Sequence, residues 1–339
     1  MNSNPKSQKT IIIGSTIIGF FVACALLTIF LPSDEDSKGK TELNESQDKQ
    51  TDERANNNDS VTISKPLEGN PYDELNSLIG LESVKAEVMS LANTVKVQKE
   101  REKQGLKSAK LTYHMVFTGN PGTGKTTVAR IIARIYKDLG VVKRGQFVET
   151  DRSGLIAAYT GQTAIKTNAV VDSALDGVLF IDEAYALVEK QGGYGDEAIA
   201  TLLKRMEDDR DRLVVIVAGY SKEMEDFINT NPGLKSRFTR YINFPDYSAD
   251  DLFKIFEKRT EKYSYKLDKD AETRLKQALA KTVAEKNKNF GNARYARNLF
   301  EQAVANQANR LAKVKSPSKS QLSTLTIDDI EYAYKNVRP

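Results

Sequence analysis

The chain has 339 residues, of which 40% are hydrophobic and 28% charged, as is ordinary for globular domains. Its net charge of +4, from 50 basic and 46 acidic side chains, is too balanced for a nucleic-acid-binding protein, and the basic residues are scattered rather than striped. The single cysteine, Cys24, excludes an internal disulfide and a zinc site, and the single histidine, His114, has no carboxylate or serine pattern near it and is expected to be a packed or capping residue.

The N-terminal region departs from this globular composition. After a tail of residues 1–10, residues 11–31 form an uncharged apolar run. As a helix with a rise of ~1.5 Å per residue, the run reaches ~30 Å, the thickness of a bilayer's hydrocarbon core. A signal peptide is the alternative, but its apolar region is only ~7–15 residues long, and a lipidated Cys24 is disfavoured because apolar residues continue past it. The run predicts a single transmembrane helix.

Residues 32–66 are dominated by polar and charged side chains, which predicts a disordered linker because little apolar surface can be buried. Short apolar runs then alternate with helical stretches from residue 67 to 245, beginning with a helix whose apolar positions are spaced by three and four. The alternation predicts an α/β core with a parallel sheet. The first helix of the core has its apolar positions at Leu81, Val84, Val88, Leu91 and Val95.

Residues 246–339 show only helical periodicity, which predicts a helical domain with "SPSKSQ" (316–321) as a loop.

A phosphate-binding motif follows the first apolar run of the core. "GNPGTGKT" (119–126) fits G-x-x-x-x-G-K-[ST] after a strand and at the start of a helix. Its backbone amides and the helix dipole suit phosphates, Lys125 supplies a positive charge, and Thr126 supplies a hydroxyl for Mg²⁺. Because no guanine-specifying "NKxD" is present, ATP is the expected nucleotide. The predicted nucleotide-contacting residues are Gly119, Asn120, Pro121, Gly122, Thr123, Gly124, Lys125, Thr126 and Thr127.

Two adjacent carboxylates follow a second apolar run, in "VLFIDEA" (178–184). Asp182 is expected to bind Mg²⁺, and Glu183 to orient and deprotonate the attacking water. A helix-capping acidic pair is the alternative, because acidic residues favour helix starts. Placed after a phosphate-binding loop and before another strand, the pair indicates ATP hydrolysis rather than transfer to a second substrate.

Two groups of arginines could serve the same site. Arg237 and Arg240 lie beyond the apolar run "LVVIVAGY", and an arginine supplied by a neighbouring subunit can accelerate phosphoryl cleavage by ~10³–10⁵. Arg294 and Arg297, in "GNARYARN", begin a helix of the small domain and could contact phosphates. Surface ion pairing is the alternative for Arg237 and Arg240.

Taken together, these motifs resemble the AAA+ family of ring-forming ATPases over roughly residues 70–339, and most closely the branch of red-type rubisco activase and stage V sporulation protein K. The motifs are "GNPGTGKTTVAR", "YTGQTA-KT", "VLFIDEAYAL", "VVIVAGY", "NPGL-SRF", "FPDY" and "GNAR-ARN". The resemblance implies a P-loop α/β core with a C-terminal helical lid. It also implies that Lys125 and Thr126 bind ATP and Mg²⁺, that Asp182 is a Mg²⁺ ligand, and that Glu183 is the hydrolytic carboxylate.

The resemblance also assigns residues outside the two nucleotide motifs. Arg237 is the first candidate for the arginine finger and Arg240 the second, and Arg294 is similar to the family's lid sensor. "LIGL" (78–81) matches the segment that lines the adenine pocket. Tyr159 falls in the loop that points into the ring's pore in this family, where an aromatic side chain grips a polypeptide. The alternative is that Tyr159 packs against its own subunit. The strand "VVIVAGY" ends in Gly219–Tyr220 instead of the usual polar sensor, so no residue is assigned that role.

These observations predict a membrane-anchored ATPase, hexameric when active, that remodels or threads a protein client and binds no nucleic acid. A head-to-tail interface that places each arginine finger in the next site closes into a ring. The alternative is an ATP-controlled membrane scaffold; a DNA loader is disfavoured by the even charge. Lysines flank the span almost evenly, and the terminal amine slightly favours an inside N-terminus. Because hydrolysis requires ATP, we give this slight charge bias less weight and expect the ATPase domain to face the cytosol.

Overall fold

The computed structural model describes residues 60–64, 68–107, 109, 111–159, 161–188, 194–288 and 290–339. The predicted tail, the predicted transmembrane helix (11–31) and most of the predicted linker lie outside these residues. Within the described ranges, no helix combines the length and apolar character needed to cross a bilayer.

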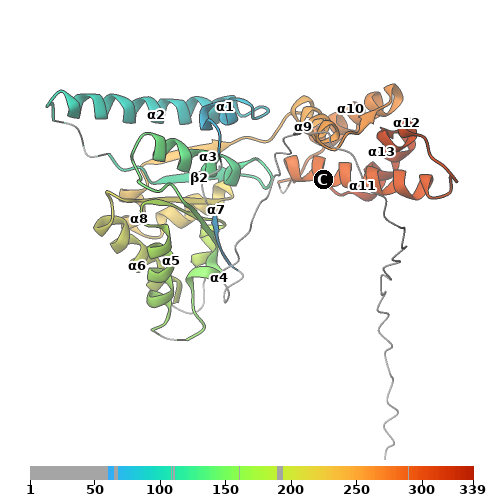
Figure 1. The fold of residues 1–339 in the computed structure, drawn as a ribbon. Coiled ribbons are helices and arrows are strands. Elements are labelled where there is room, and N and C mark those ends of the chain that lie inside the picture. The colour runs from blue at the N-terminus through green and yellow to red at the C-terminus, as the bar shows by residue number, and fades with distance from the viewer. Residues whose placement is uncertain are drawn as a thin grey trace, which may run out of the picture. The chain divides into compact units, whose positions relative to one another are not determined.

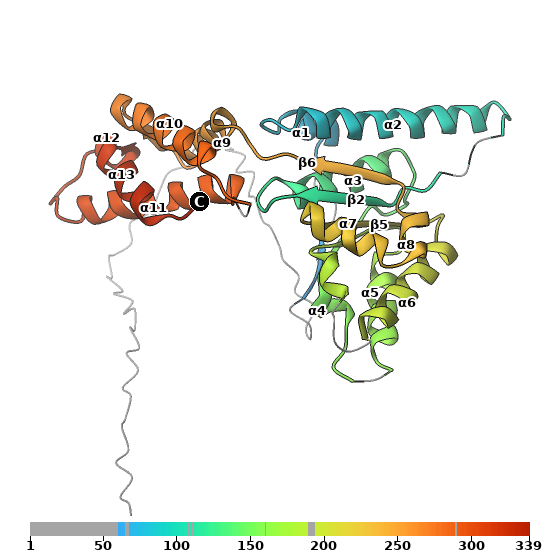
Figure 2. The same ribbon diagram turned by 180° about the vertical axis from the view of Figure 1, so that it is seen from behind.

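A six-stranded sheet with the order β1-β3-β4-β5-β2-β6 forms the centre of the core (Figure 1). The five strands from β2 to β6 are parallel, as predicted. Figure 2 shows β6 beside β2 at one edge. The strands are β1 (Val61–Ser64), β2 (Met115–Gly119), β3 (Phe147–Thr150), β4 (Gly177–Ile181), β5 (Leu213–Gly219) and β6 (Arg240–Phe244).

Strand β1 corrects two predictions. It lies within residues 32–66, which were predicted to be a disordered linker, and it pairs antiparallel with β3, so the sheet is not wholly parallel. Val61 pairs with Thr150, and the Thr150 hydroxyl donates a hydrogen bond of 3.1 Å to the Ser60 carbonyl. Backbone pairing with an existing strand edge therefore orders this segment, although Thr62 and Ile63 are exposed.

Alternate residues of the buried strands pack on opposite faces of the sheet, as strand geometry requires. Val178 and Phe180 belong to one apolar cluster, and Leu179 and Ile181 to the other. The first cluster is covered by α1 (Pro71–Asn76), α2 (Glu82–Lys103) and α3 (Lys125–Asp138). The second is covered by α4 (Arg152–Leu155), α5 (Thr163–Ala174), the 3-10 helix η1 (Ala184–Leu187), α6 (Tyr194–Asp208), α7 (Ser221–Asn229) and α8 (Pro232–Arg237).

The residues after β6 form the predicted helical domain, with two departures from the prediction. Residues 316–321 are not wholly a loop, because Ser318 caps a short helix there. Two short strands also pair in parallel, although only helices were expected. These were missed because two-residue strands have no detectable periodicity. The elements are α9 (Ala249–Lys262), β7 (Lys266–Leu267), α10 (Lys269–Ala284), α11 (Asn292–Leu311), α12 (Lys319–Ser323), β8 (Thr324–Leu325) and α13 (Ile327–Asn336).

Candidate active site

The phosphate-binding loop connects buried strand β2 to α3, as the motif predicts. Gly124, the residue before the helix, has φ 93°, a left-handed conformation that glycine adopts without steric cost. The Lys125 ammonium folds back over the loop and donates hydrogen bonds of 2.8 and 2.9 Å to the carbonyl oxygens of Gly119 and Asn120. The loop thus holds its own lysine at the N-terminal end of α3, where the helix dipole favours an anion.

A pocket of about 320 Å³ opens over this loop, which is a volume suited to a small-molecule ligand. It is lined by most of the predicted loop residues, by both predicted carboxylates and by the predicted lid arginine. Two predicted contact residues, Asn120 and Thr123, do not line it; the Thr123 hydroxyl instead donates to the Asn120 carbonyl at 2.8 Å. The lining residues are Gly119, Pro121, Gly122, Gly124, Lys125, Thr126, Thr127, Asp182, Glu183, Gly219, Tyr220, Ala293 and Arg294.

Strand β4 delivers the two carboxylates to the pocket. Asp182 directly follows the strand, and its backbone amide bonds to the Thr150 carbonyl at 2.9 Å. The Glu183 amide donates to the Asp182 carboxylate at 3.0 Å, and the Glu183 side chain is exposed. Glu183 has φ 48°, a left-handed conformation that costs a residue with a β-carbon roughly 1–2 kcal/mol. Strain of this kind, at a residue that lines a pocket, is typical of functional positions.

Three charged side chains act on the Lys125 ammonium: Asp182, Glu183 and Arg294. Burial lowers the pKa of Lys125; Asp182 and Glu183 act in the opposite direction, and the Arg294 guanidinium adds to the lowering. Two carboxylates and two cations therefore face the same small volume. Such an arrangement can bind a polyanion through the cations while the carboxylates remain available for a metal ion and a water molecule.

The end of β5 adds lining residues to which sequence reasoning gave no role. Gly219 and Tyr220 both line the pocket, and the rings of Tyr185 and Tyr220 lie 6.0 Å apart. A β-carbon on Gly219 would lie 2.7 Å from the Tyr185 ring and 2.8 Å from the Met224 sulfur, so a larger residue here would displace one of these side chains. The position after β5 was visible as a departure from the family pattern, but only the fold shows that it faces the phosphate-binding loop.

The helical domain completes the pocket. The Ala293 amide, in the first turn of α11, donates to the Gly122 carbonyl at 3.1 Å, which brings the helix N-terminus against the phosphate-binding loop. Arg294 and Ala293 line the pocket from this side. The sequence prediction that Arg294 belongs with the loop residues agrees with this geometry. Arg297, one turn further, instead pairs with Glu301 at 2.7 Å.

Comparisons with known proteins bear on this architecture. Residues 115–246 match the family model described as "ATPase family associated with various cellular activities (AAA)", and residues 248–339 match the AAA lid domain. Stage V sporulation protein K of Bacillus subtilis is 41% identical over 262 residues, covering 76% of this chain and 80% of that protein. The chain belongs to the AAA ATPase family.

Other relatives agree with this assignment. Protein CbbX of Cereibacter sphaeroides is 44% identical over 257 residues, covering 75% of this chain and 82% of that protein. ESX-3 secretion system protein EccA3 of Mycobacterium tuberculosis (strain ATCC 25618 / H37Rv) is 43% identical over 275 residues, covering 76% of this chain. The alignment spans only 44% of EccA3, less than half its length. The crystal structure of the FIGL-1 AAA domain in complex with ADP shares the fold, with a TM-score of 0.58 and 18% identity over 83% of this chain and 88% of that one. The chain is an ATPase of the AAA+ type with a C-terminal lid.

The two candidate arginine fingers of this AAA ATPase lie away from its own pocket. Arg237 ends α8, where its guanidinium lies 3.5 Å from Glu207, and its side chain is 26% exposed. Arg240 begins β6 opposite Met115, the first residue of β2, whereas the phosphate-binding loop follows the last residue of β2. Burial raises the pKa of the Tyr136 phenol, and the charge of Arg240 acts in the opposite direction. Neither arginine lines the nucleotide pocket of its own chain.

The loop that carries Tyr159 is fixed at its base by side chains of α5. The Lys166 ammonium donates to the carbonyl oxygens of Ser153 at 2.7 Å and Ile156 at 3.2 Å. The Thr167 hydroxyl donates to Leu155 at 3.1 Å, and Thr163 accepts from the Ala157 amide at 3.2 Å. These bonds give structural roles to Thr163, Lys166 and Thr167 of the "YTGQTA-KT" motif. Beyond this base, Tyr159 is 70% exposed.

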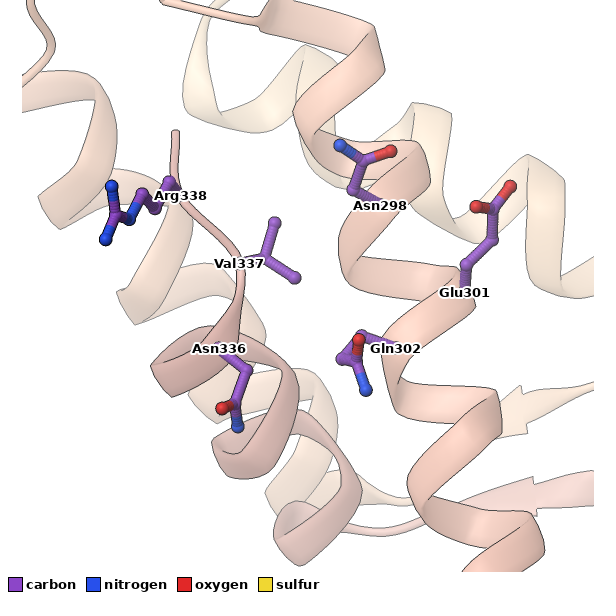
Figure 3. A pocket seen from close by; sticks show the side chains of 6 residues that line it. All are labelled: Asn298, Glu301, Gln302, Asn336, Val337 and Arg338. Atoms are coloured by element: carbon purple, nitrogen blue, oxygen red, sulfur yellow. The ribbon is translucent and has the colours of Figure 1, made fainter. Parts of the chain in front are cut away.

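A second pocket, of about 480 Å³, lies in the lid between α11 and the residues that end α13 (Figure 3). Figure 3 shows Val337 directed toward α11 and Arg338 directed away from it. Glu301, the acidic residue of this pocket, is already paired with Arg297 and lies 3.6 Å from Arg259. The pocket contains none of the nucleotide motifs. Its lining residues are Asn298, Glu301, Gln302, Asn336, Val337 and Arg338.

His114 is a packed residue, as expected from the sequence. It is 3% exposed, its Nδ1 accepts the Val215 amide at 3.0 Å, and its ring lies 6.2 Å from that of Phe238. Burial lowers the pKa of His114 to about 4; a backbone hydrogen bond with Met206 raises it, and Arg237 lowers it further. Histidine chemistry therefore plays no part in the pocket.

Proposed function

We propose that this AAA ATPase assembles into a membrane-anchored hexameric ring and uses ATP hydrolysis to remodel or thread a protein client through the pore. The observation that carries the proposal is Tyr159, whose ring is 70% exposed on a loop with a fixed base. A large ring with few torsions can grip many sequences while losing little conformational entropy. Ile165, also 70% exposed in the first turn of α5, adds a second apolar side chain near this loop.

The residues of the pocket have different roles in ATP hydrolysis. Lys125 and Arg294 neutralise the phosphates, and Glu183 accepts a proton from the water that attacks the γ-phosphate. The Thr126 hydroxyl and the Asp182 carboxylate both line the pocket and are the hard oxygen donors that Mg²⁺ prefers. When bound, Mg²⁺ would neutralise charge on the phosphate oxygens. Glu183→Gln should leave nucleotide binding intact and abolish turnover.

The ring follows from the position of the arginines. Because neither Arg237 nor Arg240 lines its own pocket, each could instead serve a neighbouring site across a head-to-tail interface, and such contacts form a ring when the rotation between subunits closes. Arg237 is the first candidate and Arg240 the second, because of the resemblance of "NPGL-SRF" to the family motif.

Membrane anchoring rests on the apolar run at residues 11–31, and ATP supply places the ATPase domain in the cytosol. Reporter fusions at each terminus test this topology. A C-terminal reporter that is active only outside the cytosol would overturn it.

The client is sought by crosslinked pulldown with Glu183→Gln in the presence of ATP, since a loaded ring should retain what it grips. The matched control is Glu183→Gln/Tyr159→Ala. A protein retained by the first variant and lost from the second supports gripping by Tyr159. Equal retention by both variants favours the alternative function, an ATP-controlled scaffold that remodels nothing.

A further inference from the structure

Asp246 occupies the junction between the core and the lid. It follows β6, two residues before the capping residue of α9, and its side chain is 16% exposed. One carboxylate oxygen accepts the side-chain amides of Asn120, at 2.9 Å, and Asn292, at 2.8 Å. The other oxygen accepts the Lys286 ammonium at 2.7 Å. A single carboxylate thus binds the phosphate-binding loop and two separate parts of the lid.

On the core side, Asn120 leads directly to the phosphate-binding lysine. Its side chain points to Asp246 rather than to the pocket, while its carbonyl oxygen accepts the Lys125 ammonium at 2.9 Å and the Thr123 hydroxyl at 2.8 Å. A shift of Asp246 would therefore move the peptide on which Lys125 rests.

On the lid side, Asn292 is fully buried at the start of α11. It has φ 49°, a left-handed conformation in which asparagine is enriched. Its side-chain amide donates to Asp246 and to the Phe290 carbonyl at 3.0 Å, and its oxygen accepts the Tyr247 amide at 2.9 Å. This network fixes the helix start that presents Arg294 to the pocket.

The groups around Asp246 favour the ionised form of its carboxylate. Burial raises the pKa of Asp246, but the hydrogen bonds from Lys286, Asn292 and Asn120 together with the Lys286 charge outweigh it and hold that pKa below its usual value. Charge-assisted bonds of this kind are about twice as strong as neutral ones, and removing one partner from a partly buried set leaves the others imperfectly satisfied.

We propose that Asp246 is a positioning residue that couples the orientation of the lid to the phosphate-binding loop, and so sets how tightly the site holds nucleotide. Asn120 carries the coupling to Lys125, and Lys286 carries it to the connection between α10 and α11. Asn292 carries it to Arg294. The inference concerns the ATPase site alone and does not depend on a client, a membrane or a pore.

The test is a mutant cycle on the full chain, with the dissociation constant of a fluorescent ADP analogue as the readout. Asn120→Ala removes the core-side partner, and Lys286→Met removes the lid-side partner; the two bond to different oxygens of Asp246. We expect each to weaken ADP binding about tenfold, equivalent to about 1.4 kcal/mol. Independent effects would multiply to a hundredfold loss. Because both substitutions act through one carboxylate, we expect the loss in the double variant to be at least threefold smaller than that.

The same cycle in an Asp246→Ala background identifies the coupling residue. We expect the non-additivity to disappear there. Additive effects when Asp246 is present, or unchanged non-additivity in its absence, would overturn the proposal, as would ADP binding within twofold of wild type for Lys286→Met. Lys286 is 32% exposed, so its variant is expected to fold, and the thermal midpoint checks this.

Steady-state ATP hydrolysis separates positioning from general damage. Asp246→Asn keeps the shape of the side chain. For this variant we expect the KM for ATP to rise about tenfold, which is a larger change than any fall in kcat. A fall in kcat with KM unchanged would contradict the proposal. Glu272→Gln is the matched control, because it removes a carboxylate from another lysine pair of the lid, the 2.6 Å pair with Lys276, and should change neither constant.

Discussion

The backbone amide of Ala293, in the first turn of the lid helix α11, lies 3.1 Å from the carbonyl oxygen of Gly122 in the phosphate-binding loop. This approach depends on glycine. A β-carbon on Gly122 would lie 2.3 Å from the Gly291 carbonyl oxygen and 2.9 Å from the Arg294 amide, and Gly122 has φ 70°. The loop and the lid are therefore in direct backbone contact at the site where phosphates are expected.

Replacing this glycine should separate the lid from the loop. We expect Gly122→Ala to weaken ADP binding at least tenfold and to destabilise the protein by more than about 1 kcal/mol, because alanine is strained at positive φ. Gly291→Ala is the matched control across the same contact, since its β-carbon would have no neighbour closer than 3.6 Å. Nucleotide titration and thermal unfolding check both; equal effects of the two substitutions would contradict this account of the contact.

The left-handed backbone of Glu183 predicts that glycine can replace this residue without loss of stability, although activity is lost. Glu183→Gln and Glu183→Gly should both lower ATP turnover by ~10²–10⁴, the usual contribution of a general base. At an ordinary exposed position the glycine variant would be less stable by about 0.5–1 kcal/mol. Because Glu183 has φ 48°, we expect Glu183→Gly to be no less stable than Glu183→Gln in urea unfolding. A glycine variant that is clearly less stable would show that the backbone is unstrained here.

A mixing experiment tests whether Arg237 acts on a neighbouring subunit. Arg237→Ala and Glu183→Gln should each be inactive alone, with ~10³–10⁵ lost for the arginine. In an equal mixture, sites that combine an intact Glu183 with an intact Arg237 from the neighbour should restore about a quarter of wild-type turnover, as random assembly in a ring predicts. Arg240→Ala, tested in the same way, should lose less activity alone. No recovery in the Arg237→Ala mixture would place that arginine outside the neighbouring site.

The buried His114 makes stability depend on pH. Its pKa is lowered to about 4 in the folded protein, so the folded state binds the proton more weakly than the unfolded state does. The resulting stability is fully present above about pH 6.5 and is lost as the pH falls toward 4. Between pH 7.5 and 5 we expect the free energy of unfolding to fall by about 2 kcal/mol more in the wild type than in His114→Gln. Identical losses in urea titrations of the two proteins would show that His114 does not titrate in this way.

The sequence predicted the site best where the chemistry is local. The phosphate-binding loop and the Asp182–Glu183 pair are short motifs with fixed neighbours, so their places after β2 and β4 could be read directly. Strand β1 could not be predicted, because its order comes from backbone pairing with β3 rather than from its own side chains.

The contacts between the core and the lid also could not be predicted from the sequence. Asp246 lies in the motif "FPDY" and Asn292 in "GNAR-ARN", but neither motif by itself indicates a role for these residues. Their partnership, at 2.8 Å, joins residues 46 positions apart and exists only after the lid has folded back onto the loop. The same is true of Lys166, whose part in holding the Tyr159 loop depends on carbonyl groups of the preceding helix α4 and the residue after it.

In the proposed function, ATP turnover drives Tyr159 to act on a client protein. Once a client has been captured with Glu183→Gln, the most direct test is hydrogen exchange of the client's amides during ATP turnover by wild type and by Tyr159→Ala. We expect the wild type to accelerate exchange in an ATP-dependent manner and Tyr159→Ala not to do so, although the variant still hydrolyses ATP. Equal acceleration by both proteins, or no acceleration by either, would contradict it.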